Sequence, residues 1–359
     1  MDIPAFDPKE LTPSGWAFSM SGRIPVFSYP VPVRDAYISF MRDRKPIWQL
    51  TGNETRIFTP RIIPDNKARA FVFEAARFDS LKDGGGFDMF GVEWEYVPVA
   101  GGSMEKPGQI MLEDMNDWES TLVWPDPDSW DWEGSAKENA EYVSGDTALQ
   151  VWFQTGWFER LISFMEFEGA IMALIDEDQK DAIKAFFTKL GDLYIDMIDH
   201  YVHYFPQTAC IYMHDDWGSQ KETFFSPSIV EEMIVPYMKK VTDHIHSIGR
   251  VAELHSCGQI FKQVPNIIAA GWDTWSGQAM NDTHKIYELY GDKLVVGVIP
   301  EQYDANALSE EEQRAKAREF AEKFCRPDKP CVINNYGASA LTLPYREELY
   351  KQSRILFGK

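Results

Sequence analysis

Apolar residues recur with two different periods along this chain, and the change of period marks out its elements. After about residue 147, short apolar runs typical of strands alternate with longer segments whose apolar residues are three or four positions apart. The expected strands are 149–153, 208–213, 251–254, 272–276, 293–298 and 331–335, and the expected helices are 156–168, 178–205, 226–248, 260–270, 282–290, 309–325 and 344–357. Repeated strand–helix units predict a parallel sheet covered by helices.

The part before residue 145 is less regular. Residues 1–30 contain five prolines and are expected to form an extended lead-in that wraps around the rest. A helix is expected over 33–44, and strands are expected at 46–50 and 70–73. Residues 90–99 alternate between apolar and polar and precede two glycines, which predicts one arm of a hairpin.

The number of strand–helix units, in a chain of 359 residues, favours a closed barrel over an open doubly wound sheet. We therefore predict the α/β class and a (β/α)8 TIM barrel with an N-terminal extension and hairpin and loop insertions. Residues 1–359 are expected to form a single domain, with the wrap and the insertions inside 1–145. There is no repeat of fixed period and no linker.

The charge balance narrows the possible partners. The chain has 35 basic and 56 acidic residues, a net charge of −21, which argues against nucleic acid and against an anionic membrane surface. Its start lacks a basic, apolar signal pattern, and no window approaches the roughly 20 apolar residues of a membrane span. Four cysteines are too few for a disulfide scaffold of this length. We expect a cytoplasmic protein.

Histidine and cysteine are unevenly distributed along the chain. All seven histidines lie between His200 and His284, and all four cysteines come after residue 209. Metal or acid–base chemistry is therefore expected in the C-terminal half.

His255 and Cys257 follow the expected strand 251–254. Two positions apart on an extended chain, their side chains point the same way. An imidazole and a thiolate in this arrangement provide half of a zinc site. The alternative is a hydrogen-bonded histidine beside a buried, inert cysteine at a strand-to-helix turn.

Polar residues also follow the other expected strands. His214-Asp-Asp-Trp-Gly-Ser-Gln220 comes after 208–213, and Gln278, Glu301 and Tyr336 lie just beyond later strands. Active sites of such barrels are built from the loops at these strand ends, so the pattern predicts an enzyme.

Asp215 or Asp216 could orient a substrate or act as a base. The alternative is that these carboxylates favour the first turn of a helix. His214 could bind a ligand or simply pack. Gln220 and Glu222 lie close enough in sequence to support the same site.

The stretch 212–278 resembles the uroporphyrinogen decarboxylase superfamily, and within it the corrinoid-dependent methyltransferases. The similarity rests on Asp215-Asp-Trp-Gly-Ser-Gln220, Ser226-Pro227, Pro236-Tyr237, Gly249, His255-Ser-Cys-Gly258, Gly271-Trp-Asp273 and Gln278. Phe90-Gly-Val-Glu-Trp94 and the loop 125–132 are also similar. The resemblance implies the same barrel.

Members of that branch move a methyl group to or from a corrinoid on a separate small protein, and several hold zinc by a His-x-Cys pair and a later cysteine. His255 and Cys257 match the pair, but residues 336–339 contain no cysteine. Some members are thought to use carboxylates and a histidine instead, which Asp216, Glu222 or Glu301 could supply. The resemblance thus implies zinc ligands His255, Cys257 and Glu222, catalytic groups His214, Asp215 and Asp216, and substrate contacts from Gln220, Gln278 and Tyr336.

Two forms of the reaction are implied. With a thiol, zinc would present a thiolate; with an aryl methyl ether, a phenolate would leave as the corrinoid cobalt(I) attacks the methyl group. The absent cysteine and the aromatic-rich N-terminal half favour the ether, with the methyl group passing to a cognate corrinoid protein. A decarboxylase would require an arginine-rich signature that Arg34, Arg42 and Arg44 do not form. The third alternative is a non-catalytic subunit that docks the corrinoid protein.

Overall fold

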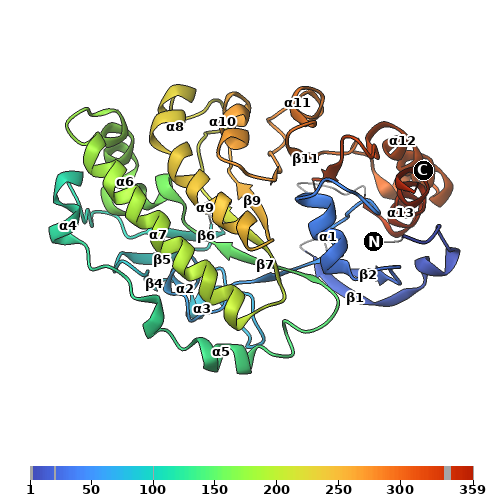
Figure 1. Cartoon of the computed structure of the whole chain (residues 1–359), viewed down its shortest axis with the longest axis horizontal. Helices are drawn as coiled ribbons and strands as arrows, with labels where there is room; N and C mark the ends of the chain where they lie inside the picture. The colour runs from blue at the N-terminus through green and yellow to red at the C-terminus, as the bar shows by residue number, and fades with distance from the viewer. Residues whose placement is uncertain (1–2, 20–21, 100, 335–340, 359) are drawn as a thin grey trace. The chain divides into compact units, whose positions relative to one another are not determined.

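The computed structural model describes residues 3–19, 22–99, 101–334 and 341–358 (Figure 1). The chain divides into two compact units. The terminal unit comprises Met1–Arg56, Asp146–Ala148 and Asp273–Lys359, and the central unit comprises Ile57–Gly145 and Leu149–Trp272.

The central unit contains three parallel strands, a small antiparallel sheet and the longest helices of the described chain. The strand β3 (Thr55–Phe58) leads into it. Its elements are α2 (Pro64–Ala68), α3 (Ser80–Asp83), β4 (Gly86–Phe87), β5 (Glu93–Val97), β6 (Gly102–Glu105), η2 (Met115–Asp117), α4 (Trp118–Thr121), η3 (Pro127–Ser129), α5 (Trp132–Glu138), β7 (Ala148–Phe153), α6 (Trp157–Ile175), α7 (Lys180–Tyr204), β8 (Thr208–His214), α8 (Pro227–Met233), α9 (Val235–Ser247), β9 (Val251–His255), η4 (Phe261–Gln263) and α10 (Val264–Ala269).

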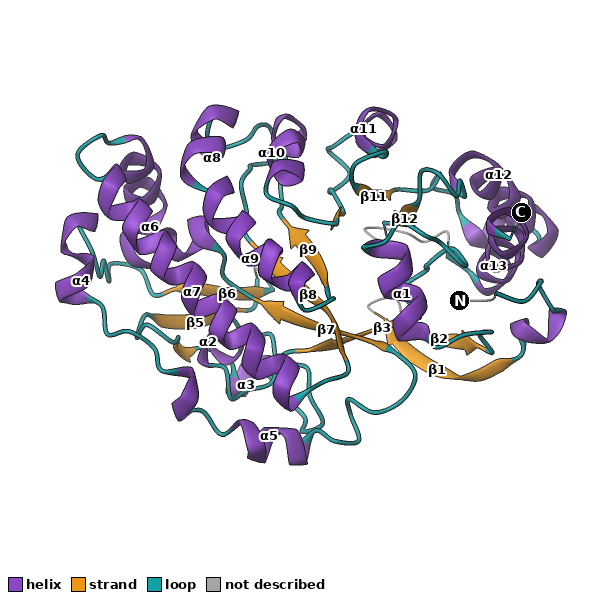
Figure 2. Ribbon diagram, in the orientation of Figure 1, coloured by secondary structure: helices purple, strands orange, loops and turns teal. Residues whose placement is uncertain are grey.

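Strands β7, β8 and β9 are parallel neighbours in that order (Figure 2). Trp152 pairs with Tyr212, and His214 pairs with His255. Side chains alternate between the two faces of a strand. One face is apolar and packs on helices, as Phe153 does against Tyr194 of α7, with ring centroids 5.6 Å apart. The other face therefore carries the polar and half-buried side chains, including both paired histidines.

The helices that cover the apolar face differ in two places from those expected. The helix predicted over 226–248 is two helices, α8 and α9, separated at Ile234, whose φ is −122° and ψ −48°. Pro236 explains the break, because a proline clashes with the carbonyl group four residues before it in a continuous helix. Helix α6 is kinked at Glu166, where φ is 59° and ψ 173°.

A buried ion cluster joins the first turn of α6 to the segment before β7. Arg160 is fully buried; it donates to Asp88 Oδ2 at 2.8 Å and also pairs with Asp65. Burial lowers the pKa of Arg160, but the two carboxylates outweigh that effect and raise it, so the guanidinium stays charged. The cluster connects α6 to α2 and to the residue that follows β4.

Of the elements expected before residue 105, two strands are not formed and the hairpin arm is. Residues 46–50 form no strand, and 70–73 contribute only the isolated bridge between Phe73 and Thr59. The hairpin arm predicted over 90–99 is confirmed as β5, which pairs with both β4 and β6.

The terminal unit holds the remaining strand–helix repeats. Its elements are η1 (Pro8–Leu11), β1 (Pro13–Ser19), β2 (Gly22–Phe27), α1 (Val33–Met41), β10 (Thr274–Trp275), α11 (Thr283–Tyr290), β11 (Val295–Val298), η5 (Ala305–Ala307), α12 (Glu310–Phe324), β12 (Cys331–Ile333) and α13 (Leu343–Phe357). Strands β10, β11 and β12 are parallel neighbours. The N-terminal segment is not simply extended, because β1 and β2 pair as an antiparallel hairpin.

Parallel strands that alternate with helices along the chain confirm the predicted α/β class. In the part of the chain that is described, no helix has both the length and the apolar character needed to cross a membrane.

Candidate metal centre

Four side chains from the ends of β8 and β9 meet in the central unit. They are His214, Asp216, His255 and Cys257, and their nitrogen, oxygen and sulfur atoms all lie within 4.8 Å of one another. His255 Nε2 is 3.1 Å from Cys257 Sγ. Asp216 Oδ1 is 3.7 Å from His214 Nε2 and 4.0 Å from His255 Nε2.

The register of the two strands brings these residues together. His214 and His255 are the last residues of β8 and β9 and are paired, with their rings 4.7 Å apart and nearly parallel at 24°. Two residues beyond the end of each strand lie Asp216 and Cys257, and the backbone N–H of Cys257 donates to Asp216 Oδ1 at 2.7 Å. Each strand end therefore contributes one histidine and, two residues later, one further donor group.

Two glycines allow the loops after these strands to touch. Gly258 has a φ of +87°, and a Cβ atom there would lie 2.2 Å from the carbonyl carbon of Gly218. A side chain at position 258 would separate the loop that carries Cys257 from the loop that follows Asp216.

A carboxylate contacts the nitrogen of His214 that faces away from the other three donors. Its Nδ1 lies 2.6 Å from Oε2 of Glu159, in the first turn of α6, and Glu159 Oε1 is 3.4 Å from Arg69. This contact leaves Nε2 of His214 facing the other three groups. A carboxylate on the outer nitrogen of a ligand histidine fixes the ring and its tautomer.

Glu159 and His214 each stabilise the charged form of the other. Burial raises the pKa of Glu159, but His214 and Arg69 outweigh that effect and bring the pKa to about 2. Burial lowers the pKa of His214, whereas the negative charge of Glu159 raises it above its ordinary value overall. Glu159 is therefore ionised at neutral pH.

Two of the four donors, His255 and Cys257, are neutral without a cation beside them. Burial, together with the charge of His214, lowers the pKa of His255 to about 3, so its ring is uncharged at neutral pH. Burial and the nearby Asp216 raise the pKa of the Cys257 thiol. A bound cation would reverse this preference for the thiol, because metal binding releases the proton of a cysteine ligand.

Asp215 is not one of the four donors. It is fully buried, and its carboxylate accepts hydrogen bonds from the backbone N–H groups of Phe158 and Glu159 and from Trp217 Nε1, at 3.3, 2.9 and 2.9 Å. Burial, aided by the charge of Glu159, raises its pKa to about 7. This geometry matches the alternative given above for Asp215, a carboxylate at the first turn of a helix. The helix, however, is α6, which precedes Asp215 in sequence, and not the helix that follows it.

The remaining predicted residues lie outside the group. Gln220 and Glu222 are exposed, and Glu222 Oε2 pairs with Lys262 Nζ at 2.6 Å. A bridge between Gly218 and Thr223 folds this loop back, which explains why Glu222 is not among the four donors. Gln278 lies in the terminal unit, where its backbone carbonyl accepts from Asn281. Tyr336 lies outside the described residues.

Two residues beside the centre were missed by the sequence analysis. Glu159 follows β7 by six positions, so the strand-end criterion would have included it if applied to the strand 149–153 as well. Arg69 comes from the end of α2, and no local pattern indicates its position. It stacks over Trp94, with the guanidinium carbon 4.8 Å from the ring centroid.

The chemistry of the donors fits a metal ion. Two imidazoles, one carboxylate and one thiol in a group of four match the ligand types and number that zinc prefers. His255 is already neutral, and His214 has its outer nitrogen occupied by Glu159. We therefore regard the four side chains as a candidate metal centre.

Comparison with known proteins adds information about the fold. No family model matches the chain, and no curated protein matches it. Among solved structures, a methyltransferase from Methanosarcina mazei is similar, with a TM-score of 0.52 and 14% identity over 91% of this chain and 85% of that one. An α-galactosidase from Saccharomyces cerevisiae aligns at a TM-score of 0.30 and 10% identity, over 65% of this chain and 52% of that one. At this identity, the first likeness shows the fold alone: the chain has the TIM-barrel-like α/β fold that its sequence predicts.

Proposed function

We propose that this protein is a methyltransferase that moves the methyl group of an aryl methyl ether to the corrinoid of a separate protein, assisted by zinc. The observation that carries the proposal is the group formed by His214, Asp216, His255 and Cys257 at two adjacent strand ends. The similarity of the stretch 212–278 to corrinoid-dependent methyltransferases and the name of the Methanosarcina mazei structure agree with it.

Zinc fits this role because all four donors belong to types that it accepts, and His255 and Cys257 repeat the His-x-Cys pair of the resemblance. His214 and Asp216 replace the later cysteine and the predicted ligand Glu222. When bound, zinc would supply a Lewis acid that polarises the ether oxygen of the substrate.

The aromatic side chains next to the centre favour an aryl substrate over a small thiol. Trp152 stacks on Tyr212, with centroids 3.9 Å apart, and Tyr212 in turn stacks on His255 at 6.0 Å. Trp152 and Tyr212 are only partly buried and lie on the polar face of the sheet. We infer that an aromatic substrate would pack near these rings, since contact between aromatic rings is favourable.

Two residues of the chain would arrange the centre. Glu159 orients His214, so that the donor set is arranged before substrate arrives. Asp215 fixes the start of α6 and with it Glu159. In the reaction, the C–O bond breaks, its electron pair stays on the aryl oxygen, and the methyl group passes to the reduced corrinoid, which provides the pair for the new bond.

The test is an assay of zinc-loaded protein with methoxylated aromatics and a reduced corrinoid protein. We expect release of a phenol and methylation of the corrinoid in equal amounts, both abolished in Cys257→Ser. Absence of phenol release across a panel of methoxylated aromatics would contradict the ether reaction. Demethylation of the methylated corrinoid by an added thiol would indicate the thiol reaction instead.

A further inference from the structure

Two buried N–H donors lie on the polar side of β7, one within the strand and one just beyond its end. Gln154 is only 6% exposed, and its Nε2 has no hydrogen-bond partner among the residues that the structure describes. The same holds for Nε1 of Trp152, two positions earlier. A buried donor without a partner is costly, and native proteins rarely keep one without a ligand or a water to satisfy it.

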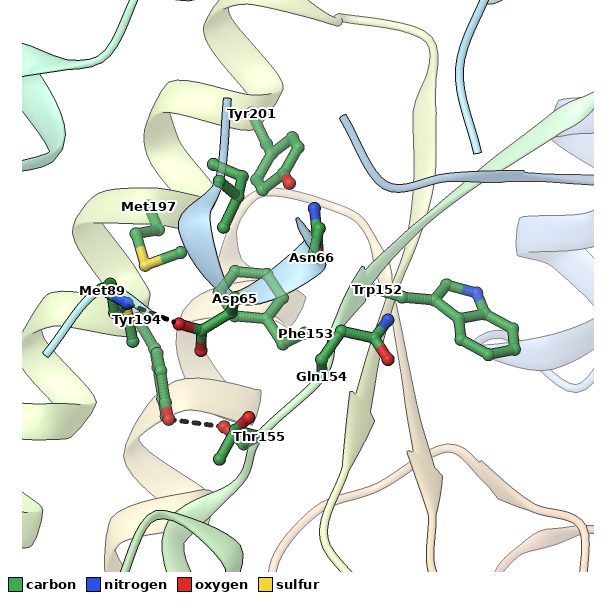
Figure 3. Close-up of a pocket in the computed structure, with 11 residues that line it drawn as sticks. Asp65, Asn66, Met89, Trp152, Phe153, Gln154, Thr155, Tyr194, Met197 and Tyr201 are labelled. Atoms are coloured by element: carbon green, nitrogen blue, oxygen red, sulfur yellow. Dashed lines mark hydrogen bonds between the residues drawn. The ribbon is translucent and has the colours of Figure 1, made fainter. Parts of the chain in front are cut away.

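Both side chains point to the same side of the strand. In Figure 3, Trp152 and Gln154 leave β7 on the side away from Asp65 and Tyr194. Phe153 and Thr155 belong to the opposite side, where a cavity of about 10 Å³, the size of one water, is lined by Asp65 and Tyr194. Trp152 and Gln154 also border this cavity, which has room for no more than one water, but their side chains extend away from Asp65 in Figure 3.

The strand register places Gln154 level with the metal centre. Phe153 pairs with Met213, so the next residues along the two parallel strands are Gln154 and His214, and His214 pairs with His255. Gln154, His214 and His255 thus form one row across the ends of three adjacent strands. The first carries an unsatisfied donor, and the other two belong to the four-residue group.

We propose that Gln154 is a substrate-binding residue whose Nε2–H donates a hydrogen bond to the oxygen atom that loses the methyl group. This inference rests on the proposed function and narrows it to substrates with an oxygen leaving group. The amide is fixed before the reaction and meets an oxygen whose negative charge grows as the C–O bond breaks. A donor arranged in this way stabilises the transition state more than the ground state.

The chain offers a matched control on the same face of the same strand. Gln150 is also buried, but its Nε2 donates to Glu253 Oε2 at 3.1 Å. Gln150→Leu removes a satisfied amide, whereas Gln154→Leu removes an unsatisfied one. We expect Gln150→Leu to lower the melting temperature and leave phenol binding unchanged. We expect Gln154→Leu to leave the melting temperature unchanged or raise it.

The decisive measurement is calorimetric binding of phenol to the zinc-loaded wild-type, Gln150→Leu and Gln154→Leu proteins, with zinc content checked in each. The expected result is an approximately 10- to 100-fold weaker affinity in Gln154→Leu alone, the range for a hydrogen bond to a charged acceptor. In the methyl-transfer assay, the rate loss should be largest for ethers of the least acidic phenols, because their oxygen atoms accumulate the most charge.

Equal phenol affinity in wild type and Gln154→Leu, including no detectable binding to either, would overturn the inference. So would a lower melting temperature in Gln154→Leu with unchanged phenol binding. The proposed function is tested separately. If the protein transfers methyl groups but binds phenol equally well without Gln154, the proposed function stands and only the role of Gln154 is wrong. If phenol binding depends on Gln154 but no methyl group is transferred, the proposed function is wrong.

Discussion

Glu159 Oε2 lies 2.6 Å from Nδ1 of His214 and connects the first turn of α6 to the last residue of β8. The contact selects which nitrogen of His214 faces Asp216, His255 and Cys257. It also joins two elements that are far apart in sequence into one site.

Glu159→Gln should weaken zinc binding. The amide cannot stabilise the charge on the outer nitrogen of His214 as a carboxylate does, and such changes behind a ligand histidine typically cost about 10- to 100-fold in metal affinity. Competition with a coloured zinc chelator measures the effect. Glu168→Gln, at an exposed position of the same helix, is the control and should bind zinc like wild type. Wild-type affinity in Glu159→Gln would contradict the positioning role.

Asp215→Ala should destabilise the fold. Its carboxylate accepts two backbone N–H groups at the start of α6 and the indole N–H of Trp217, all in a buried setting. Leaving these donors unsatisfied should lower the free energy of unfolding by about 2–4 kcal/mol, measured by urea denaturation of the metal-free protein. If Asp215 instead acts directly on substrate, the variant should retain wild-type stability and lose only activity.

Arg160→Met should be more damaging than removal of a surface arginine. It leaves the buried carboxylates of Asp65 and Asp88 without their cation, and breaking a buried pair in this way costs about 3–5 kcal/mol. Arg318→Met, which removes a half-buried guanidinium of α12 whose partner Glu311 is exposed, should change the midpoint of unfolding less. Similar midpoints for the two variants would show that the buried cluster is not stabilising.

Because of Glu10, the terminal unit should become less stable as the pH falls into the acidic range. It accepts hydrogen bonds from Tyr350 Oη and Arg354 Nε of α13, at 2.6 and 2.8 Å. Burial raises its pKa, but these bonds outweigh burial and the pKa falls below its ordinary value. A lowered folded-state pKa stabilises the fold above the ordinary pKa, and that contribution disappears as the pH drops through the lowered value.

The experiment compares wild type with Glu10→Gln by urea denaturation over a pH series. The wild-type advantage should be about 1–2 kcal/mol near neutral pH and should shrink on acidification below a pH of about 4.5. Glu322→Gln, at an exposed position of α12, should show no such pH-dependent difference. A wild-type advantage that grows as the pH falls would contradict the assigned direction of the pKa shift.

Much of the fold could be predicted from the sequence because strand and helix periods are local properties. Strands β7, β8 and β9 lie where the apolar runs indicate, and the hairpin before residue 105 was also expected. The errors have local or long-range causes. Pro236 breaks a helix that apolar spacing alone would continue, and residues 46–50 are buried without forming a strand.

Part of the candidate site could be predicted from the sequence in the same way. His255 and Cys257 share one side of an extended segment, and their proximity follows from spacing alone. The contributions of His214 and Asp216 required the pairing of β8 with β9, which sequence does not specify. Glu222 is close to Asp216 in sequence, but its loop turns back toward Lys262. Arg69 arrives from a distant segment and carries no local signal.

The most direct test of the central claim is the metal content of purified protein, measured by mass spectrometry for wild type and five single variants. We predict one zinc ion per chain in wild type and in Glu222→Ala, and loss of the metal in His214→Ala, Asp216→Ala, His255→Ala and Cys257→Ser. Circular dichroism verifies that each variant is folded. Zinc retained in Cys257→Ser and His255→Ala, or lost in Glu222→Ala alone, would contradict the four-residue centre and the function built on it.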